Sequence, residues 1–146
     1  MNLTQATGYD TTKYAVSNIR KELRAAFKGV KFQVRKGFHT VNVNWVDGPT
    51  EFEVNKIVFK YVQATDFSKK YGKLDFANAR RAYSKTALQI VRNEVEKLYD
   101  LHTPEISGSF DDANFDNCEF YLSGVGEYVE NNMRTICKEY AKKRSF

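Results

Sequence analysis

The chain has 146 residues, the length of one compact domain, and 42% of them are hydrophobic and 14% aromatic. This composition excludes an intrinsically disordered chain, and no apolar run approaches the roughly 18 residues that a membrane-spanning helix needs. Residues 1–10 are polar and lack the apolar stretch of a signal peptide. Two isolated cysteines, Cys118 and Cys137, are too few for a disulfide scaffold. We therefore expect a cytoplasmic protein with a single domain over residues 1–146, of which 1–11 form a flexible leader.

A helical period begins at Thr12 and ends near Phe27. The apolar residues recur at three- and four-residue spacing: Val16, Ile19, Leu23, Ala26 and Phe27. Basic side chains, among them Arg20 and Arg24, fall mostly on the remaining arc. Gly29 follows and can adopt the left-handed conformation that ends many helices. The pattern predicts an amphipathic helix with a basic outer face.

The period then changes to two, which predicts a β-hairpin. Residues 31–35 and 40–45 alternate polar and apolar, and Gly37 lies in the short connection between them. The residues expected to pack inward are Phe32, Val34, Val41, Val43 and Trp45; those expected on the polar outer face are Lys31, Gln33, Arg35, Thr40, Asn42 and Asn44. Because an isolated hairpin is marginal in water, its apolar face must pack on helices.

A second helix should follow the turn Asp47-Gly48-Pro49. Thr50 and Glu53 have the spacing of a capping box, and an apolar stripe runs from Val54 to Val62. Residues 12–63 thus predict an α-β-β-α unit in which the hairpin packs on helices.

Residues 64–146 are expected to form a helical extension. We predict a loop or irregular turn over 64–74, and a long third helix from Phe76 to about Leu98, capped by Asp75. The buried side of that helix would contain Tyr83, Ala87, Ile90, Val91 and Leu98, and its exposed side Arg80, Arg81, Lys85, Arg92 and Lys97. An acidic loop over 105–117, a short strand near Cys118 and a final helix from about Gly126 complete the chain. The predicted class is α+β.

Charge is strongly segregated behind the net value of +5. Residues 12–36 contain eight Lys or Arg against Glu22 alone, whereas residues 101–131 contain seven Asp or Glu and no Lys or Arg. A basic half of this kind attracts phosphate backbones, although basic residues also solvate the outer faces of ordinary helices. Both interpretations remain open, and the acidic stretch could equally pair with the protein's own basic faces.

Signatures of catalysis are weak. His39 is expected at the hairpin tip and His102 precedes a proline, so both suit an exposed structural role better than that of a general base. Cys137 falls on the buried stripe of the last helix. The loop 123–126 is glycine-containing but lacks the lysine of a nucleotide-binding loop. We therefore expect no cofactor, no metal site and no catalytic residues.

The segment from Ile19 to Val34, together with Val41-Asn42-Val43-Asn44-Trp45-Val46-Asp47-Gly48-Pro49-Thr50, resembles a known domain family. It is similar to the large polyvalent protein-associated domain of type twenty-nine, in which a helix, a "KFSV"-like strand and a strand ending in "WxDGP" precede another helix. The resemblance covers about residues 14–63. It implies a protein of a bacteriophage or other mobile element that helps the element establish itself against host defences, and it supplies no catalytic residues.

We expect a small, non-enzymatic accessory protein that binds a host protein or nucleoprotein complex in the bacterial cytoplasm, with no membrane partner, as a counter-defence inhibitor. The alternative is a module that binds DNA or RNA directly, and a less favoured third is a small nucleotide-acting enzyme. The candidate partner-binding residues are Arg20, Arg24, Lys28, Lys31, Arg35, Trp45 and Asp47. Trp45 could instead anchor the core, and Asp47 could be a turn residue.

Overall fold

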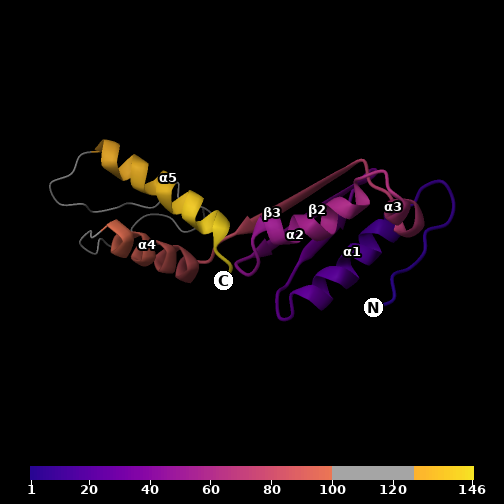
Figure 1. Ribbon diagram of the computed structural model, residues 1–146, viewed down its shortest axis with the longest axis horizontal. Coiled ribbons are helices and arrows are strands. Elements are labelled where there is room, and N and C mark those ends of the chain that lie inside the picture. Colours follow the sequence, from indigo (N-terminus) through magenta and orange to yellow (C-terminus); the bar gives the residue numbers. More distant parts are fainter. Residues whose placement is uncertain (100–126) are drawn as a thin grey trace. The chain divides into compact units, whose positions relative to one another are not determined.

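The computed structural model describes residues 1–99 and 127–146, which are coloured in Figure 1. These residues form two compact units, Met1–Arg81 and Ala82–Phe146. The mixed content of helices and strands confirms the predicted α+β class. The acidic loop over 105–117 and the short strand near Cys118 lie outside the described residues.

The first unit contains most of the elements. In chain order they are α1 (Thr12–Ala26), β1 (Gln33–Lys36), β2 (Thr40–Val46), α2 (Glu51–Val58), the 3-10 helix η1 (Phe59–Tyr61), α3 (Asp66–Tyr71) and β3 (Phe76–Ala82). The α-β-β-α order over residues 12–63 is therefore confirmed.

A three-stranded sheet with the order β1-β2-β3 supports this unit. β1 and β2 pair antiparallel, with Gln33 opposite Asn44 and Arg35 opposite Asn42. Because successive side chains of a strand point to opposite faces, the alternate residues lie on the helix-packed side of the sheet. These are Val34, Val41, Val43 and Trp45, which are buried in one core with Val16, Ile19 and Leu23 of α1 and Val54 and Val58 of α2.

The turn between β2 and α2 is tightly constrained. Trp45 is 3% exposed, and its indole Nε1 donates a hydrogen bond to the Pro49 carbonyl at 3.0 Å. Asp47 and Gly48 both have positive φ, +57° and +67°. Thr50 and Glu53 form the predicted capping box at the start of α2. The sequence from Trp45 to Thr50 is thus a structural junction that ends a strand and starts a helix.

A buried polar cluster ties α1 to η1. The Tyr61 hydroxyl donates to Glu22 Oε2 at 2.5 Å, and Lys60 forms an ion pair with the other carboxylate oxygen of Glu22. Burial, followed by the contact with Glu22, raises the pKa of the Tyr61 phenol well above its usual value. Glu22 is therefore engaged inside the fold.

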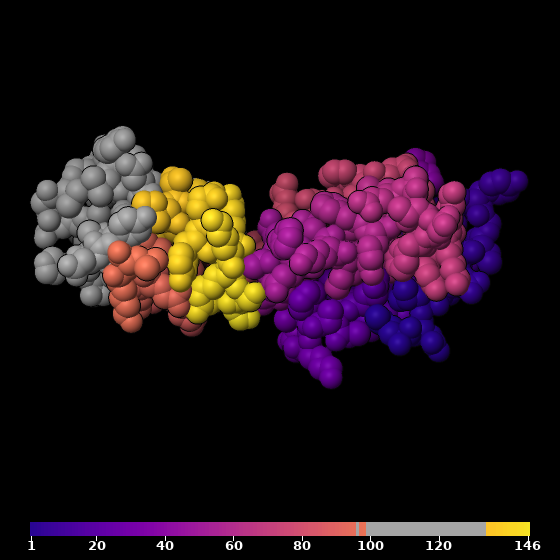
Figure 2. Space-filling view, viewed as in Figure 1, coloured from indigo at the N-terminus to yellow at the C-terminus, as the bar shows by residue number. Residues whose placement is uncertain are grey.

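The segment before α1, expected as a flexible leader, has neither helix nor strand but is held by hydrogen bonds. Thr4 and Asn18 exchange two of them, at 2.7 and 2.8 Å, and the Ala6 amide donates to the Lys70 carbonyl at 2.8 Å. Figure 2 shows this segment lying on the surface beside α3.

Two predictions for residues 64–98 were wrong. α3 occupies part of the expected loop and begins with a capping box in which Ser68, rather than Glu or Gln, is the reciprocal partner of Thr65. The predicted third helix begins at Lys85 and not at Phe76, because residues 76–82 form β3 beside β2. The strand fixes these residues through pairing with a distant part of the chain, which overrides their local helix preference.

The second unit contains α4 (Lys85–Tyr99) and α5 (Glu127–Lys143), and the predicted final helix is confirmed. Leu88, Val91 and Val95 of α4 pack in one cluster with Cys137 and Ala141. Glu94 accepts hydrogen bonds from Arg144 Nε at 2.9 Å, Arg144 Nη2 at 3.0 Å and the Tyr140 hydroxyl at 2.7 Å. These bonds, first that from Tyr140, hold the pKa of Glu94 below its usual value.

The predicted faces of the third helix need a further correction. Arg81 and Arg92 were expected to be exposed but are 7% and 1% exposed. Arg81 lies on β3, where its Nη1 donates to the carbonyls of Gly48 and Pro49, both at 3.3 Å. Leu98, expected to be buried, is 68% exposed. The position of Arg81 was wrong because residues 76–82 form a strand and not the start of the helix. Arg92 and Leu98 do lie in α4, and for these two the apolar spacing assigned the wrong side.

Candidate functional site

The five candidate cations of the first helix and hairpin are all exposed. Arg20 and Arg24 lie on α1, Lys28 lies in the turn that follows it, Lys31 precedes β1, and Arg35 lies on β1. We refer to the first four as the basic edge, because they lie on α1 and along the chain that leads into the edge strand β1. Arg35 is separate, as described below.

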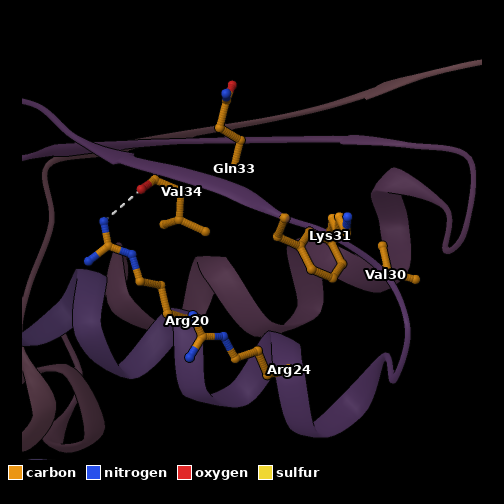
Figure 3. Close-up of a pocket in the computed structure, with 7 residues that line it drawn as sticks. Arg20, Arg24, Val30, Lys31, Gln33 and Val34 are labelled. Atoms are coloured by element: carbon orange, nitrogen blue, oxygen red, sulfur yellow. Dashed lines mark hydrogen bonds between the residues drawn. The ribbon is translucent and has the colours of Figure 1, made fainter.

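Three cations of the basic edge line one pocket of about 430 Å³ between α1 and the start of β1. Its lining residues are Arg20, Arg24, Val30, Lys31, Phe32, Gln33 and Val34. In Figure 3, Arg20 and Arg24 extend from α1, while Gln33 points away from that helix on the far side of β1. No carboxylate lines the pocket, so its polar lining favours an anion.

Arg20 has a structural contact inside this pocket. Its Nη2 donates a hydrogen bond of 2.7 Å to the carbonyl of Val34 on β1, shown as a dashed line in Figure 3. β1 is an edge strand, so this carbonyl has no strand neighbour to accept from on that side. Arg20 therefore joins α1 to the sheet as well as contributing charge, whereas Arg24 and Lys31 have no such bond within the described residues.

The charge of the basic edge is not neutralised by the described part of the chain. Among residues 1–99 and 127–146, no carboxylate forms an ion pair with Arg20, Arg24, Lys28 or Lys31. Glu22, the single acidic residue of α1, is buried against Tyr61 and Lys60. The positive potential of this surface is thus available to an external anion.

Arg35 lies on the opposite face of β1. Val34 is buried toward the helices, so its neighbours Gln33 and Arg35 point to the other side of the sheet. That side is exposed or half-buried along all three strands. The sequence offered the five cations as one set of candidate binding residues, and the structure places Arg35 on a different surface from the basic edge.

Trp45 and Asp47 do not join either surface. The indole of Trp45 is in the core, 5.6 Å from the ring of Phe32 between centroids, so a partner cannot reach it without opening the fold. Asp47 is half-buried in the turn with φ of +57°. Trp45 thus lies in the core and Asp47 in a turn, the two structural alternatives that the sequence left open.

Groups with catalytic chemistry are few in the described residues. His39 lies at the hairpin tip with φ of +51°, and its Nδ1 is 3.8 Å from Asp10 Oδ1 and 3.3 Å from the Thr12 hydroxyl. Hydrogen bonds from Thr12 lower the pKa of Asp10. Cys137 is buried, and within the described ranges no three His, Cys, Asp or Glu side chains gather as a metal site. His102, Cys118 and the loop 123–126 lie outside these ranges.

The described architecture is that of a small α+β domain in which a hairpin passes through a tryptophan-containing turn into a helix. The family model of the large polyvalent protein associated domain 29 matches residues 10–88, more than half of the chain, so the chain belongs to this family. The match confirms the resemblance and extends it through β3 to the start of α4. No curated protein matches the chain, and no solved structure does. None of the helices within the described residues has the length and apolar character needed to cross a membrane.

Proposed function

We propose that this protein is a non-enzymatic accessory protein of a phage or mobile element that binds an anionic surface of a host macromolecule through the basic edge, as a counter-defence inhibitor. Family membership supports the association with phages and mobile elements. The single observation that carries the binding function is the set of exposed cations without ion-pair partners among the described residues.

Stability does not account for Arg24, Lys28 and Lys31, which unlike Arg20 form no hydrogen bond to the sheet within the described residues. Exposed charges contribute under about 1 kcal/mol even when they are paired, and neighbouring cations without partners repel each other. Arg24 lies on α1 and Lys31 precedes β1, yet both line one pocket. A clustered charge that does not stabilise the fold is the expected property of a surface that attracts a partner of opposite sign.

Direct binding of nucleic acid is the second candidate, and the composition of the pocket favours it. Arginine and lysine without a neighbouring carboxylate suit phosphate groups, and phosphates dominate the affinity of proteins for nucleic acids. An acidic host protein would use the same cations, so the identity of the partner must be tested directly.

The test compares two charge-reversed variants of equal net charge. The first carries Arg24→Glu, Lys28→Glu and Lys31→Glu; Arg20 is kept because it bonds to Val34. The control carries Lys56→Glu, Lys69→Glu and Lys70→Glu, exposed positions of α2 and α3. Each protein is immobilised and exposed to a bacterial lysate, with and without nuclease treatment, and captured proteins and nucleic acids are both identified.

The expected result is a partner retained by the wild type and the control but lost by the first variant, while all three proteins melt within a few degrees of one another. A partner lost after nuclease treatment supports nucleic acid, and one that survives it supports a host protein. Equal retention by both variants would show that the basic edge does not bind the partner.

A further inference from the structure

The face of the sheet opposite the helices carries an unusual set of side chains. Ten residues alternate onto this face, four of them being Thr40, Val46, Phe76 and Ala82. The other six are Gln33 and Arg35 of β1, Asn42 and Asn44 of β2, and Asn78 and Arg80 of β3, and we call these six the open sheet face. These six side chains are exposed or half-buried, and none is a carboxylate. These six positions present amides and guanidinium groups, and the exposed side chains of Val46 and Phe76 lie on the same side of the sheet.

Sheet stability does not explain this composition. Asparagine is depleted in β-strands, where β-branched and aromatic residues are preferred, yet it occupies three of these positions. No described residue forms a hydrogen bond or ion pair with any of the six side chains. Residues that are unfavourable for the local structure and free to bond outward are expected where a surface is used for recognition.

The chemistry of these side chains matches the edges of DNA bases. In the major groove, Asn and Gln can bond the N6 and N7 atoms of adenine in a bidentate manner, and Arg can do so with O6 and N7 of guanine. The register places Gln33 directly opposite Asn44 and Arg35 directly opposite Asn42. Side chains at such positions start about 5 Å apart, so the hairpin carries a compact block of four base-reading groups.

The dimensions also fit. The major groove of B-form DNA is about 12 Å wide and admits a two-stranded ribbon, and neighbouring strands lie about 4.8 Å apart. β1 is the edge strand of the sheet, so the β1–β2 hairpin can enter the groove with the basic edge, next to β1, facing the phosphates of one DNA strand. Arg80 on β3 lies on the other side of the hairpin from the basic edge.

Other nucleic acids fit less well. The major groove of A-form RNA is too narrow and deep for side chains to read. Single strands are bound by stacking of successive bases on aromatic rings, and the outward positions of the three strands carry one such ring, Phe76 on β3.

We propose that the open sheet face reads base edges in the major groove of duplex DNA. The inference rests on the proposed binding function, because the basic edge supplies the phosphate contacts. The hairpin side chains Gln33, Arg35, Asn42 and Asn44 supply sequence preference, and the basic edge supplies affinity that does not depend on sequence.

The experiment selects bound sequences from duplex DNA with a randomised central segment, using the full chain. The reader variant carries Gln33→Thr, Asn42→Thr and Asn44→Thr, which removes the amides, preserves the charge and introduces a residue favoured in strands. Its control carries Asn55→Ala and Gln63→Ala, which removes amides from outside the sheet. Affinity is then measured for the selected duplex, a scrambled duplex, double-stranded RNA and single-stranded DNA.

We expect the wild type and the control to enrich one motif and to prefer it over the scrambled duplex. The reader variant should lose about tenfold or more of that preference while its affinity for the scrambled duplex stays unchanged. Three results would each overturn the inference while leaving the basic edge as a binding surface. They are binding to duplex DNA without a preferred motif, a preferred motif that the reader variant retains, and binding to RNA or single strands alone. A nuclease-resistant protein partner with no DNA binding would do the same. If no partner, neither protein nor nucleic acid, depends on the charge of the basic edge, the proposed function itself would be refuted.

Discussion

Replacing Trp45 by Ala tests the anchor of the first unit. Trp45 is the single tryptophan of the chain, is 3% exposed, contacts the Phe32 ring and donates to the Pro49 carbonyl. Truncating a buried Trp or Phe to Ala costs about 3 to 5 kcal/mol. Since a domain has a total stability of about 5 to 15 kcal/mol, this change removes a large share of it.

The expected fall in melting temperature is about 12 to 40 °C, since each kcal/mol shifts a domain of this size by about 4 to 8 °C. Trp45→Phe separates the two contributions: it keeps most of the apolar contact and removes the indole donor, so it should cost about 1 kcal/mol for the bond plus a smaller packing loss. Phe52→Ala is the matched control, because its ring is 69% exposed and its loss should change stability by less than about 0.5 kcal/mol.

The assay is urea unfolding followed by circular dichroism, with the fluorescence of Trp45 as a second probe of the first unit in the wild type and in Phe52→Ala. A free energy of unfolding for Trp45→Ala within about 1 kcal/mol of the wild type would refute the assignment of Trp45 as a core anchor. Such a result would mean that the helices and sheet hold together without the junction between β2 and α2.

Three further outcomes are expected. Gly72→Ala should destabilise the first unit by more than about 1 kcal/mol in urea unfolding, because φ is +112° and a Cβ would lie 2.4 Å from the Ala15 nitrogen; Gly29→Ala, with open space around it, should cost less. The lowered pKa of Glu94 stabilises the second unit fully above the usual pKa of 4.5, and this contribution is lost as the pH falls through the folded value. Glu94→Gln should therefore weaken the loss of helix stability at acid pH, as measured by circular dichroism at a series of pH values. An unchanged pH dependence would contradict this role. For duplex DNA, Arg24→Ala with Lys28→Ala and Lys31→Ala should reduce the slope of log affinity against log salt by about 2.7, or about 0.9 for each phosphate contact; a constant slope would exclude these contacts.

The first half of the fold could be predicted because the spacing of its apolar residues matches the period of the helix or strand that they form. The apolar residues of α1 recur every three or four residues, and those of the hairpin alternate with polar ones. Thr50 and Glu53 have the spacing of a capping box, which marks the start of α2. Trp45 was correctly placed inside because it shares the parity of Val41 and Val43. The family match over residues 10–88 agrees with this region.

β3 could not be predicted in the same way. Its sequence, Phe-Ala-Asn-Ala-Arg-Arg-Ala, contains helix formers and no β-branched residue, so its conformation depends on β2. The buried position of Arg81 follows from the carbonyls of Gly48 and Pro49, which lie far away in sequence. The hairpin part of the open sheet face was predicted as a polar outer face, but its β3 residues were assigned to a helix. Gln33, Asn42 and Asn44 were not among the candidate binding residues.

The contact between Arg20 and Val34 has a consequence for how copies of the protein behave together. An uncovered edge strand offers its backbone to a strand of another molecule, which leads to aggregation or intermolecular sheets. The guanidinium of Arg20 occupies the outward carbonyl of Val34 and keeps a bulky charge beside the edge of β1. The same side chain that lines a pocket for anions therefore also discourages this chain from extending its sheet into a neighbour.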